Sequence, residues 1–493
     1  MLISMSISAF ATQREYRAVW LTTYLGLDWP KSPATTPEGV EQQKEDLRQM
    51  LDKYVAANLN TVFVQARMRS STSYRSMYEP WDEAFTGTPG KSPLYDPLAF
   101  AVEECHKRGL ECHAWVVVFP ICKVPTEKKL GKRSLPKQRP DLCQRCGDLW
   151  MMDPGVPETA DYVANICKEI VENYNVDGIH LDYIRYPEKE IRFNDSKTYK
   201  RYGKGQNKTN WRRANVTRCV QAIHTAIKSV RPWVKLSCAP IGKYADLPRQ
   251  SSYGWNAYNA VSQEAQEWLR TGLMDALFPM MYFDGKHFYP FAVDWQENCH
   301  GRPVVPGLGI YFLNPKQRNW DLQVVQRQMN VARELGMGGQ AFFRSEFLLN
   351  NEKGLYRWLQ RDFYESPAMT PAMTWADNTP PTAPQVSVAY TEGTVHINWE
   401  AIQENAPIYY NVYRIDEPQD TPKLIAHRLQ TPSYTYTPPL PILMHSQYAV
   451  TAIDAYGNES SLSPTSAQFI TPEARISTDN KVKKALEPLR VKK

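Results

Sequence analysis

The stretch VDGIHLDYIRYP, residues 176–187, joins a short apolar run to a polar and aromatic end. Strands of a parallel sheet are buried on both faces, so they read as nearly continuous apolar runs, and residues 178–184 fit that pattern. Successive side chains of a strand point to opposite faces. The stretch therefore predicts a buried strand with two sets of side chains: His180, Asp182 and Ile184 on one face, and Ile179, Leu181 and Tyr183 on the other.

Seven other runs of this kind lie along the first part of the chain, with helical amphipathic spacing between them. Eight alternating strand and helix units over residues 14–366 predict an α/β fold, a (β/α)8 TIM barrel. An open doubly wound sheet is the alternative, but TTYLG at 22–26 replaces the glycine-rich turn that such sheets use to bind phosphate. The eight runs are residues 16–22, 61–66, 112–118, 178–184, 235–240, 276–282, 304–310 and 340–343.

The composition changes near Pro367, and a proline-rich linker is expected over residues 367–383. Short alternating runs then predict an all-β sandwich over residues 384–472. VHINW at 395–399, YNVYR at 410–414 and YAVTAIDAYGNES at 448–460 resemble strands of fibronectin type III domains, in which the Trp and Tyr are core residues. The charged segment 473–493 is expected to be disordered.

The composition is that of a globular protein, with 42% hydrophobic and 22% charged residues. The net charge of +6 is mild and much of it lies in the C-terminal tail, so we expect no nucleic-acid partner. No apolar run is long enough to span a bilayer. Residues 1–13 end in a small-x-small pattern, Ala9-Phe10-Ala11, and are interpreted as the remnant of a signal peptide. This predicts a periplasmic or secreted protein.

Cysteine and histidine patterns do not favour a metal or another cofactor. The chain has nine cysteines, of which only Cys143 and Cys146 form a motif-like pair. A structural zinc site would need a second pair nearby, so a disulfide, a redox pair and two unrelated thiols stay open. The first strand also lacks the His-x-His pair of metal-dependent barrel hydrolases.

Active sites of such barrels form at the carboxyl ends of the strands. Asp182 lies at such an end with Arg185 three residues on, which suits a nucleophile, a base or a charge stabiliser, but equally a structural ion pair. Hydrolysis of a glycosidic bond needs a second carboxyl group. The candidates for it are Asp284, Glu346 and Glu188.

Other polar and aromatic residues near the strand ends are candidates for substrate binding, because aromatic faces stack on sugar rings. Arg185 and Tyr183 follow Asp182 directly. The remaining candidates are Arg67, Arg69, His113, Trp115, Tyr282, Arg344, Trp20 and Trp29.

Three blocks together resemble the glycosyl-hydrolase-like family 10 of bacterial envelope proteins: REYRAVW at 14–20, LWMMDPG at 149–155 and DGIHLDYIRYP at 177–187. The resemblance implies hydrolysis of a glycan, with peptidoglycan strands stripped of their peptides or another bacterial polysaccharide as substrate. Asp182 matches the acidic position of the family. Many members have a second Asp directly after it, where this chain has Tyr183.

The leading hypothesis is a glycoside hydrolase in which Asp182 is essential. The alternative is a non-catalytic glycan-binding or scaffold protein that uses the barrel mouth as a groove, and a barrel deacetylase or lyase is a third. The sequence makes no prediction of the oligomeric state.

Overall fold

The computed structural model describes residues 13–248, 250, 254–416, 420–439 and 446–463. The expected signal-peptide remnant, apart from residue 13, and the charged tail lie outside these residues. The chain divides into two compact units, one formed by Glu15–Glu365 and the other by the residues on either side of it. Among the described residues, no helix has the length and apolar character needed to cross a membrane.

Eight parallel strands of the first unit form one sheet in the order β10-β11-β1-β2-β3-β7-β8-β9. The two outer strands also pair: the amide of Val305 donates to the carbonyl of Leu277 (2.8 Å), and that of Gly307 donates to the carbonyl of Pro279 (2.8 Å). The sheet therefore closes on itself, which confirms the predicted barrel. The strands are β1 (Tyr16–Leu21), β2 (Thr61–Arg67), β3 (Glu111–Val117), β7 (Gly178–Asp182), β8 (Lys235–Cys238), β9 (Ala276–Leu277), β10 (Gly307–Leu308) and β11 (Gly339–Phe342).

Two of the strands, β9 and β10, are shorter than their apolar runs. Pro279 follows β9, and Pro303 and Pro306 precede β10. Proline has no amide hydrogen and cannot donate to a strand ladder, so regular pairing stops there. The carbonyl groups of all three still accept hydrogen bonds from neighbouring strands, which keeps the barrel closed.

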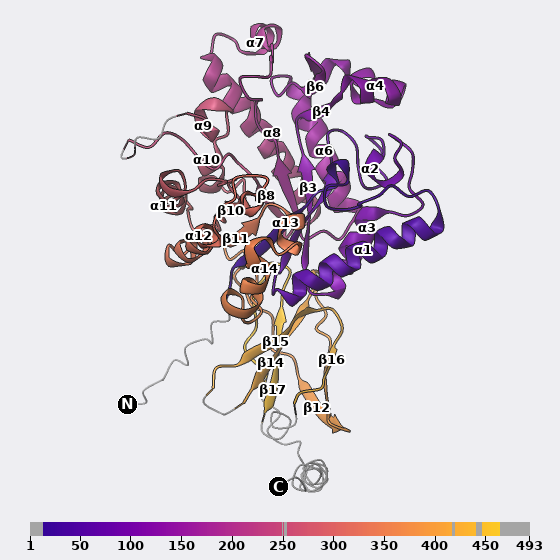
Figure 1. Ribbon diagram of the computed structural model, residues 1–493, viewed down its shortest axis with the longest axis vertical. Helices are drawn as coiled ribbons and strands as arrows, with labels where there is room; N and C mark the ends of the chain where they lie inside the picture. Colours follow the sequence, from indigo (N-terminus) through magenta and orange to yellow (C-terminus); the bar gives the residue numbers. More distant parts are fainter. Residues whose placement is uncertain (1–12, 249, 251–253, 417–419, 440–445, 464–493) are drawn as a thin grey trace. The chain divides into compact units, whose positions relative to one another are not determined.

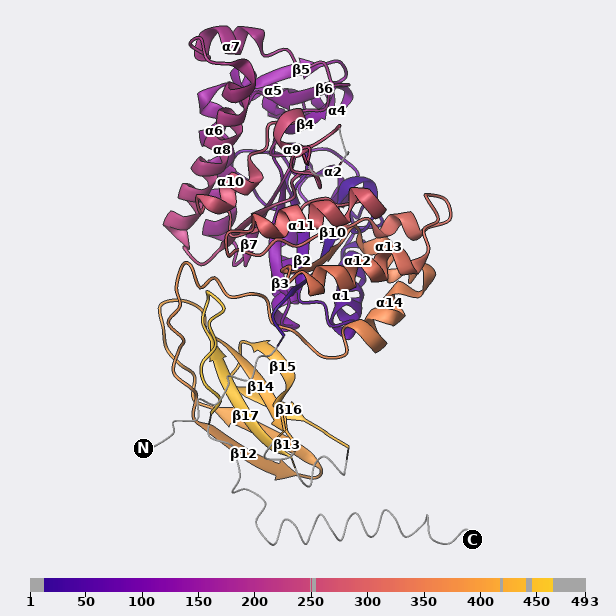
Figure 2. The same cartoon turned by 90° about the vertical axis from the view of Figure 1, so that its left-hand side faces the viewer.

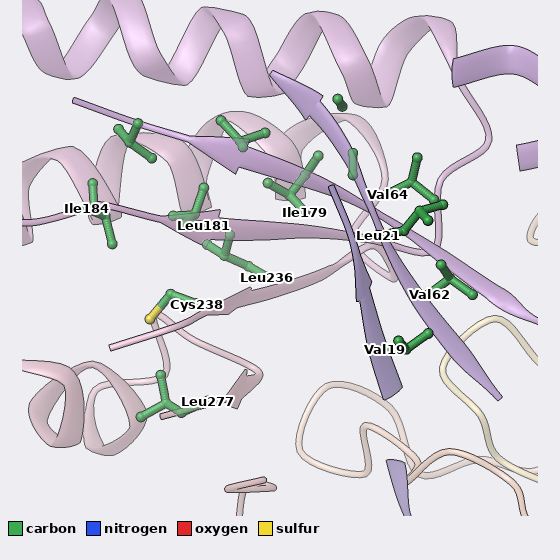
Figure 3. Packing of buried hydrophobic residues seen from close by; sticks show 14 of the residues in the cluster. Val19, Leu21, Val62, Val64, Ile179, Leu181, Ile184, Leu236, Cys238 and Leu277 are labelled. Atoms are coloured by element: carbon green, nitrogen blue, oxygen red, sulfur yellow. The ribbon is translucent and has the colours of Figure 1, made fainter. Parts of the chain in front are cut away.

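The strands bury both of their faces. Their outward side chains pack with the surrounding helices, as Figure 3 shows for Val19, Val62, Ile179 and Leu236. The inward side chains form a separate aromatic core inside the barrel. That inner core includes Tyr16, Trp20, Phe63, Trp115, Phe278 and Val305.

Helices surround the barrel strands (Figures 1 and 2). Several begin with a side chain that satisfies a free amide of the first turn: Asp96 accepts from the amide of Ala99 (2.9 Å), and Asp321 from that of Gln323 (2.8 Å). The longer helices are α1 (Pro37–Ala56), α3 (Pro97–Lys107), α6 (Pro157–Asn173), α8 (Lys208–Val230), α10 (Ala265–Arg270), α11 (Tyr289–Glu297) and α12 (Leu322–Glu334). Shorter ones are α2 (Glu83–Thr86), α7 (Ser196–Tyr202), α9 (Ala257–Ala260), α13 (Ser345–Leu349) and α14 (Leu355–Trp358).

An insertion between β3 and α6, not foreseen from the sequence, forms a small antiparallel sheet in the order β4-β6-β5. It consists of β4 (Pro120–Lys123), α4 (Val124–Leu130), α5 (Leu135–Gln138), β5 (Cys143–Cys146) and β6 (Leu149–Met152). Because it follows the carboxyl end of β3, the insertion lies at the end of the barrel where active sites form.

The second unit contains two antiparallel sheets, β12-β13-β16 and β15-β14-β17. Side chains from both sheets, among them Trp399, Tyr410 and Tyr448, share one apolar cluster, so the unit is a sandwich and these aromatics are core residues. The strands are β12 (Val386–Thr391), β13 (Thr394–Trp399), β14 (Tyr409–Ile415), β15 (Lys423–Leu429), β16 (Ser433–Tyr436) and β17 (Gln447–Ile453).

Candidate active site at the barrel mouth

Asp182 is the last residue of β7 and is held in place by two hydrogen bonds. Its Oδ2 accepts from the indole Nε1 of Trp115 (3.2 Å), and its Oδ1 accepts from the amide of Tyr183 (2.7 Å). Only 7% of the residue is exposed. Two strands and one turn thus fix the carboxyl group at the carboxyl end of the barrel.

The alternation predicted along β7 holds up to Asp182 and then fails. Ile179 and Leu181 pack outward as predicted, and His180 lies in the barrel interior. Tyr183 adopts a left-handed backbone conformation (φ +51°), which ends the strand. As a result Tyr183 packs on the inner core, whereas Ile184 packs outward, the reverse of the predicted faces.

Burial raises the pKa of Asp182 to about 6, against the opposing effects of Arg185 and of the two hydrogen bonds. The nearby carboxylate of Glu188 raises it further. A carboxyl group with this pKa is protonated in a substantial fraction of molecules near neutral pH. Asp182 is therefore suited to donate a proton.

Arg185 lies beside this carboxyl group and is only 3% exposed. Its guanidinium carbon lies 4.5 Å from the ring centre of Tyr183 and 5.4 Å from that of Trp255. Nη2 donates to Oε1 of Glu188 (2.8 Å), while Nε and Nη1 are buried without a hydrogen-bond partner. Such unpaired donors are costly in a protein interior and are often explained by a missing ligand or water.

Aromatic side chains line the mouth opposite β7. Tyr282 stacks on Phe343 with ring centres 5.3 Å apart, and Tyr311 meets Tyr282 edge to face at 5.9 Å. Burial and the charge of Asp182 raise the pKa of Tyr282 well above its usual value, which places its hydroxyl near that carboxylate. Of this wall, sequence reasoning named Tyr282 but missed Phe343, Tyr311 and Trp255. Their position just after strand runs was the available signal.

The three candidates for the second carboxyl group differ in their surroundings. Glu188 shares Arg185 with Asp182 and keeps 28% of its side chain exposed. Glu346 is paired with Arg344, its Oε2 lying 2.5 Å from Nη2. Asp284 is exposed on the loop after β9. The structure brings only Glu188 of these three into the immediate surroundings of Asp182.

Two of the predicted substrate-binding arginines are held by protein groups. Arg67 donates to both carboxylate oxygens of Glu79 (2.6 and 2.7 Å) and to the carbonyl of Val118 (2.7 Å). Arg344 forms ion pairs with Asp28 and Glu346. Both guanidinium groups therefore fasten loops at the mouth.

Trp20, Trp29 and His113 are buried and bonded inside the protein. The indole of Trp20 donates to Nε2 of His180 (3.0 Å), and that of Trp29 to the carbonyl of Gln43 (2.6 Å). His113 lies 3.0 Å from the carboxylate of Glu111. These three belong to the barrel interior or its loops rather than to the mouth.

Arg69 lies at the mouth and also lines a neighbouring cleft of about 410 Å³. Its guanidinium carbon is 4.9 Å from the ring centre of Tyr24. Loops after β1 and β2 and the insertion after β3 form the cleft walls, which include Trp81, Lys31 and Lys123.

All nine cysteines lie among the described residues and each is a free thiol, Cys143 and Cys146 included. Within the described part of the chain, no group of three or more His, Cys, Asp or Glu side chains is arranged to hold a metal ion.

Comparison with known proteins agrees with this architecture. Residues 15–308 match the family model described as glycosyl hydrolase-like 10. The chain is 32% identical over 489 residues to the glycosyl hydrolase YngK of Bacillus subtilis (strain 168), covering 92% of this chain and 93% of that one. It is also 32% identical over 288 residues to the glycosyl hydrolase DigH of Escherichia coli (strain K12), covering 54% and 65%.

Among solved structures, the glycoside hydrolase domain of PgaB from Bordetella bronchiseptica matches with a TM-score of 0.45 at 14% identity, covering 71% of this chain and 98% of that one. The α-L-fucosidase isoenzyme 2 of Paenibacillus thiaminolyticus matches with a TM-score of 0.48 at 16% identity, covering 71% and 49%. The family match and the full-length relative carry the assignment: this chain belongs to the glycosyl hydrolase-like 10 family.

Proposed function

We propose that the protein hydrolyses glycosidic bonds in a bacterial envelope polysaccharide, with Asp182 as the proton donor. The observation that carries the proposal is the buried carboxyl group at the barrel mouth, whose pKa of about 6 suits a general acid. The names of the relatives, both glycosyl hydrolases, support the same reaction class. Peptidoglycan strands freed of their peptides are the first substrate to test.

The surrounding residues suit the remaining steps of such a reaction. Asp182 would protonate the oxygen that leaves the scissile bond, while positive charge develops on the sugar ring. Glu188 is the favoured second carboxyl, as a base for water or as a nucleophile, because Arg185 pairs with it at 2.8 Å and favours its ionised form. Tyr282 and Tyr183 offer aromatic surface for a sugar ring.

The test is release of reducing ends by the purified protein from amidase-treated peptidoglycan and a panel of other polysaccharides. Asp182→Asn and Glu188→Gln are each expected to abolish release, whereas Asp284→Asn is the matched control and retains it. Cleavage that survives in Asp182→Asn, with products unchanged, would overturn the proposed role of this carboxyl.

Glycan binding without cleavage is the second candidate function. Tyr183 favours it, because it occupies the position where many family members have a second Asp. Retention on insoluble peptidoglycan with no release of reducing ends, by wild type and Asp182→Asn alike, would support binding alone. A periplasmic or secreted location goes with either proposal and is tested by fractionating cells that produce the full chain.

A further inference from the structure

Two arginines flank Tyr183 at the barrel mouth. Arg185 stacks on the tyrosine ring at 4.5 Å. Burial raises the pKa of the Tyr183 hydroxyl, whereas the positive charges of Arg185 and Arg69 both lower it, so Arg69 acts on the same group from the β2 side. Two guanidinium groups from separate loops thus meet around one aromatic side chain beside Asp182.

Neither arginine is fully used by the protein. Arg185 is 3% exposed, and its Nε and Nη1 are buried donors without a partner. Across the described part of the chain, the Arg69 side chain makes a ring contact with Tyr24 but no hydrogen bond or ion pair. Arg67 and Arg344, by contrast, are both paired with carboxylates.

The cleft that begins at Arg69 continues this positive surface. Lys31 and Lys123 also line it, and neither is paired with a carboxylate in the described residues. Of the two acidic liners, Asp82 is buried and accepts a hydrogen bond from the amide of Ala84, which leaves Glu83 as the exposed one. The cleft, about 410 Å³ in volume, also has aromatic walls.

We propose that the mouth recognises a carboxylate-bearing sugar, held by Arg69 and Arg185 at Tyr183, with neighbouring sugars of the same chain lying in the cleft. Guanidinium groups bind carboxylates through paired, charge-assisted hydrogen bonds, and aromatic walls stack on sugar rings. The inference rests on the proposed function and narrows its substrate to acidic glycans. Arg69 is the residue that sets this specificity.

The experiment compares one polymer in two charge states. Amidase-treated peptidoglycan strands, which carry a free lactyl carboxylate on alternate sugars, are used as such or after reduction of the carboxyl groups to alcohols. Wild type is expected to prefer the acidic strands in kcat/KM by about tenfold or more, because charged hydrogen bonds discriminate by that amount. In Arg69→Gln this preference falls toward one. Arg75→Gln, an exposed arginine of the same β2 loop outside the cleft, retains it.

A parallel binding measurement separates this inference from the proposed function. Asp182→Asn protein is titrated with both polymers and with a polyuronate, which tests a carboxylate attached directly to the sugar ring. Cleavage of acidic and reduced strands at equal efficiency would overturn the inference and leave the hydrolase intact. Preferential binding of acidic strands without cleavage by wild type would overturn only the hydrolase. No cleavage and no binding of any polymer would overturn both.

Discussion

His180 and Asp182 lie two residues apart on β7 and both face the barrel interior, yet their surroundings differ. Both nitrogens of His180 have partners, since Trp20 donates to Nε2 (3.0 Å) and Nδ1 lies 2.9 Å from the hydroxyl of Ser237. Burial lowers the pKa of His180 well below its usual value, so it is neutral. The floor of the barrel is therefore an uncharged, internally bonded layer.

At the mouth, one layer above, the polar groups are charged and only partly bonded. Asp182 keeps a raised pKa, and Arg185 keeps two buried donors without partners. A buried polar group with all of its hydrogen bonds contributes to stability, whereas an unsatisfied one costs stability and points to a ligand. The comparison thus assigns the floor to folding and the mouth to binding and chemistry.

The largest expected effect is that of Asp182→Asn on activity, a loss of about 10²–10⁴-fold if the carboxyl is the general acid. Stability should move the other way. The folded pKa of Asp182, about 6, exceeds its usual 3.8, so its stabilising contribution is full at low pH and is lost as pH rises from about 4 through 6. Asparagine does not ionise, so at pH 7 the variant should be at least as stable as wild type.

Urea unfolding at pH 5 and pH 7, alongside reducing-end assays, checks both parts. A loss of activity matched by a loss of stability would make Asp182 a structural residue and erase the contrast with His180.

A change in the floor should have the opposite profile. Trp20→Phe removes the donor to Nε2 of His180 and is expected to lower the free energy of unfolding by about 1–3 kcal/mol. Activity per folded molecule should stay within a few-fold of wild type, measured at a temperature where both proteins are folded. Normal stability combined with a large fall in kcat/KM would show that the floor takes part in the reaction.

The smallest expected effect is on the pH profile. Since Asp182 acts protonated, kcat/KM should fall as pH rises through about 6. Trp115→Phe removes a hydrogen bond that lowers the pKa of Asp182, so the alkaline limb should shift upward, by up to about one pH unit. A downward shift, or no alkaline limb at all, would contradict the assignment of Asp182 as the acid.

The sequence predicted the barrel well because strands buried on both faces leave a strong apolar signal. All eight runs became strands, and Asp182 was identified at the end of β7. The insertion after β3 was missed, since its strands are only four residues long and their periodicity is weak. The sandwich strands β15 and β16 were missed as well, because their alternation is mixed with polar residues.

Site residues were harder to predict because strand position does not tell whether a polar group is already bonded. Arg67 and Arg69 are two residues apart, yet one is held by Glu79 and the other is not. Trp20 and Trp115 both face the barrel interior, but only Trp115 reaches Asp182. These differences depend on partners distant in sequence, which no local pattern reveals.

The left-handed conformation of Tyr183 has a consequence for how this barrel can evolve. It interrupts the inside–outside alternation directly after Asp182, so the orientation of the carboxyl group is set by the preceding strand and by one turn. Insertions or deletions beyond Tyr183 can therefore alter the following loop without rotating Asp182. The chain carries a natural boundary between a constant reactive group and an interchangeable loop, which is where grafting of loops from relatives should be best tolerated.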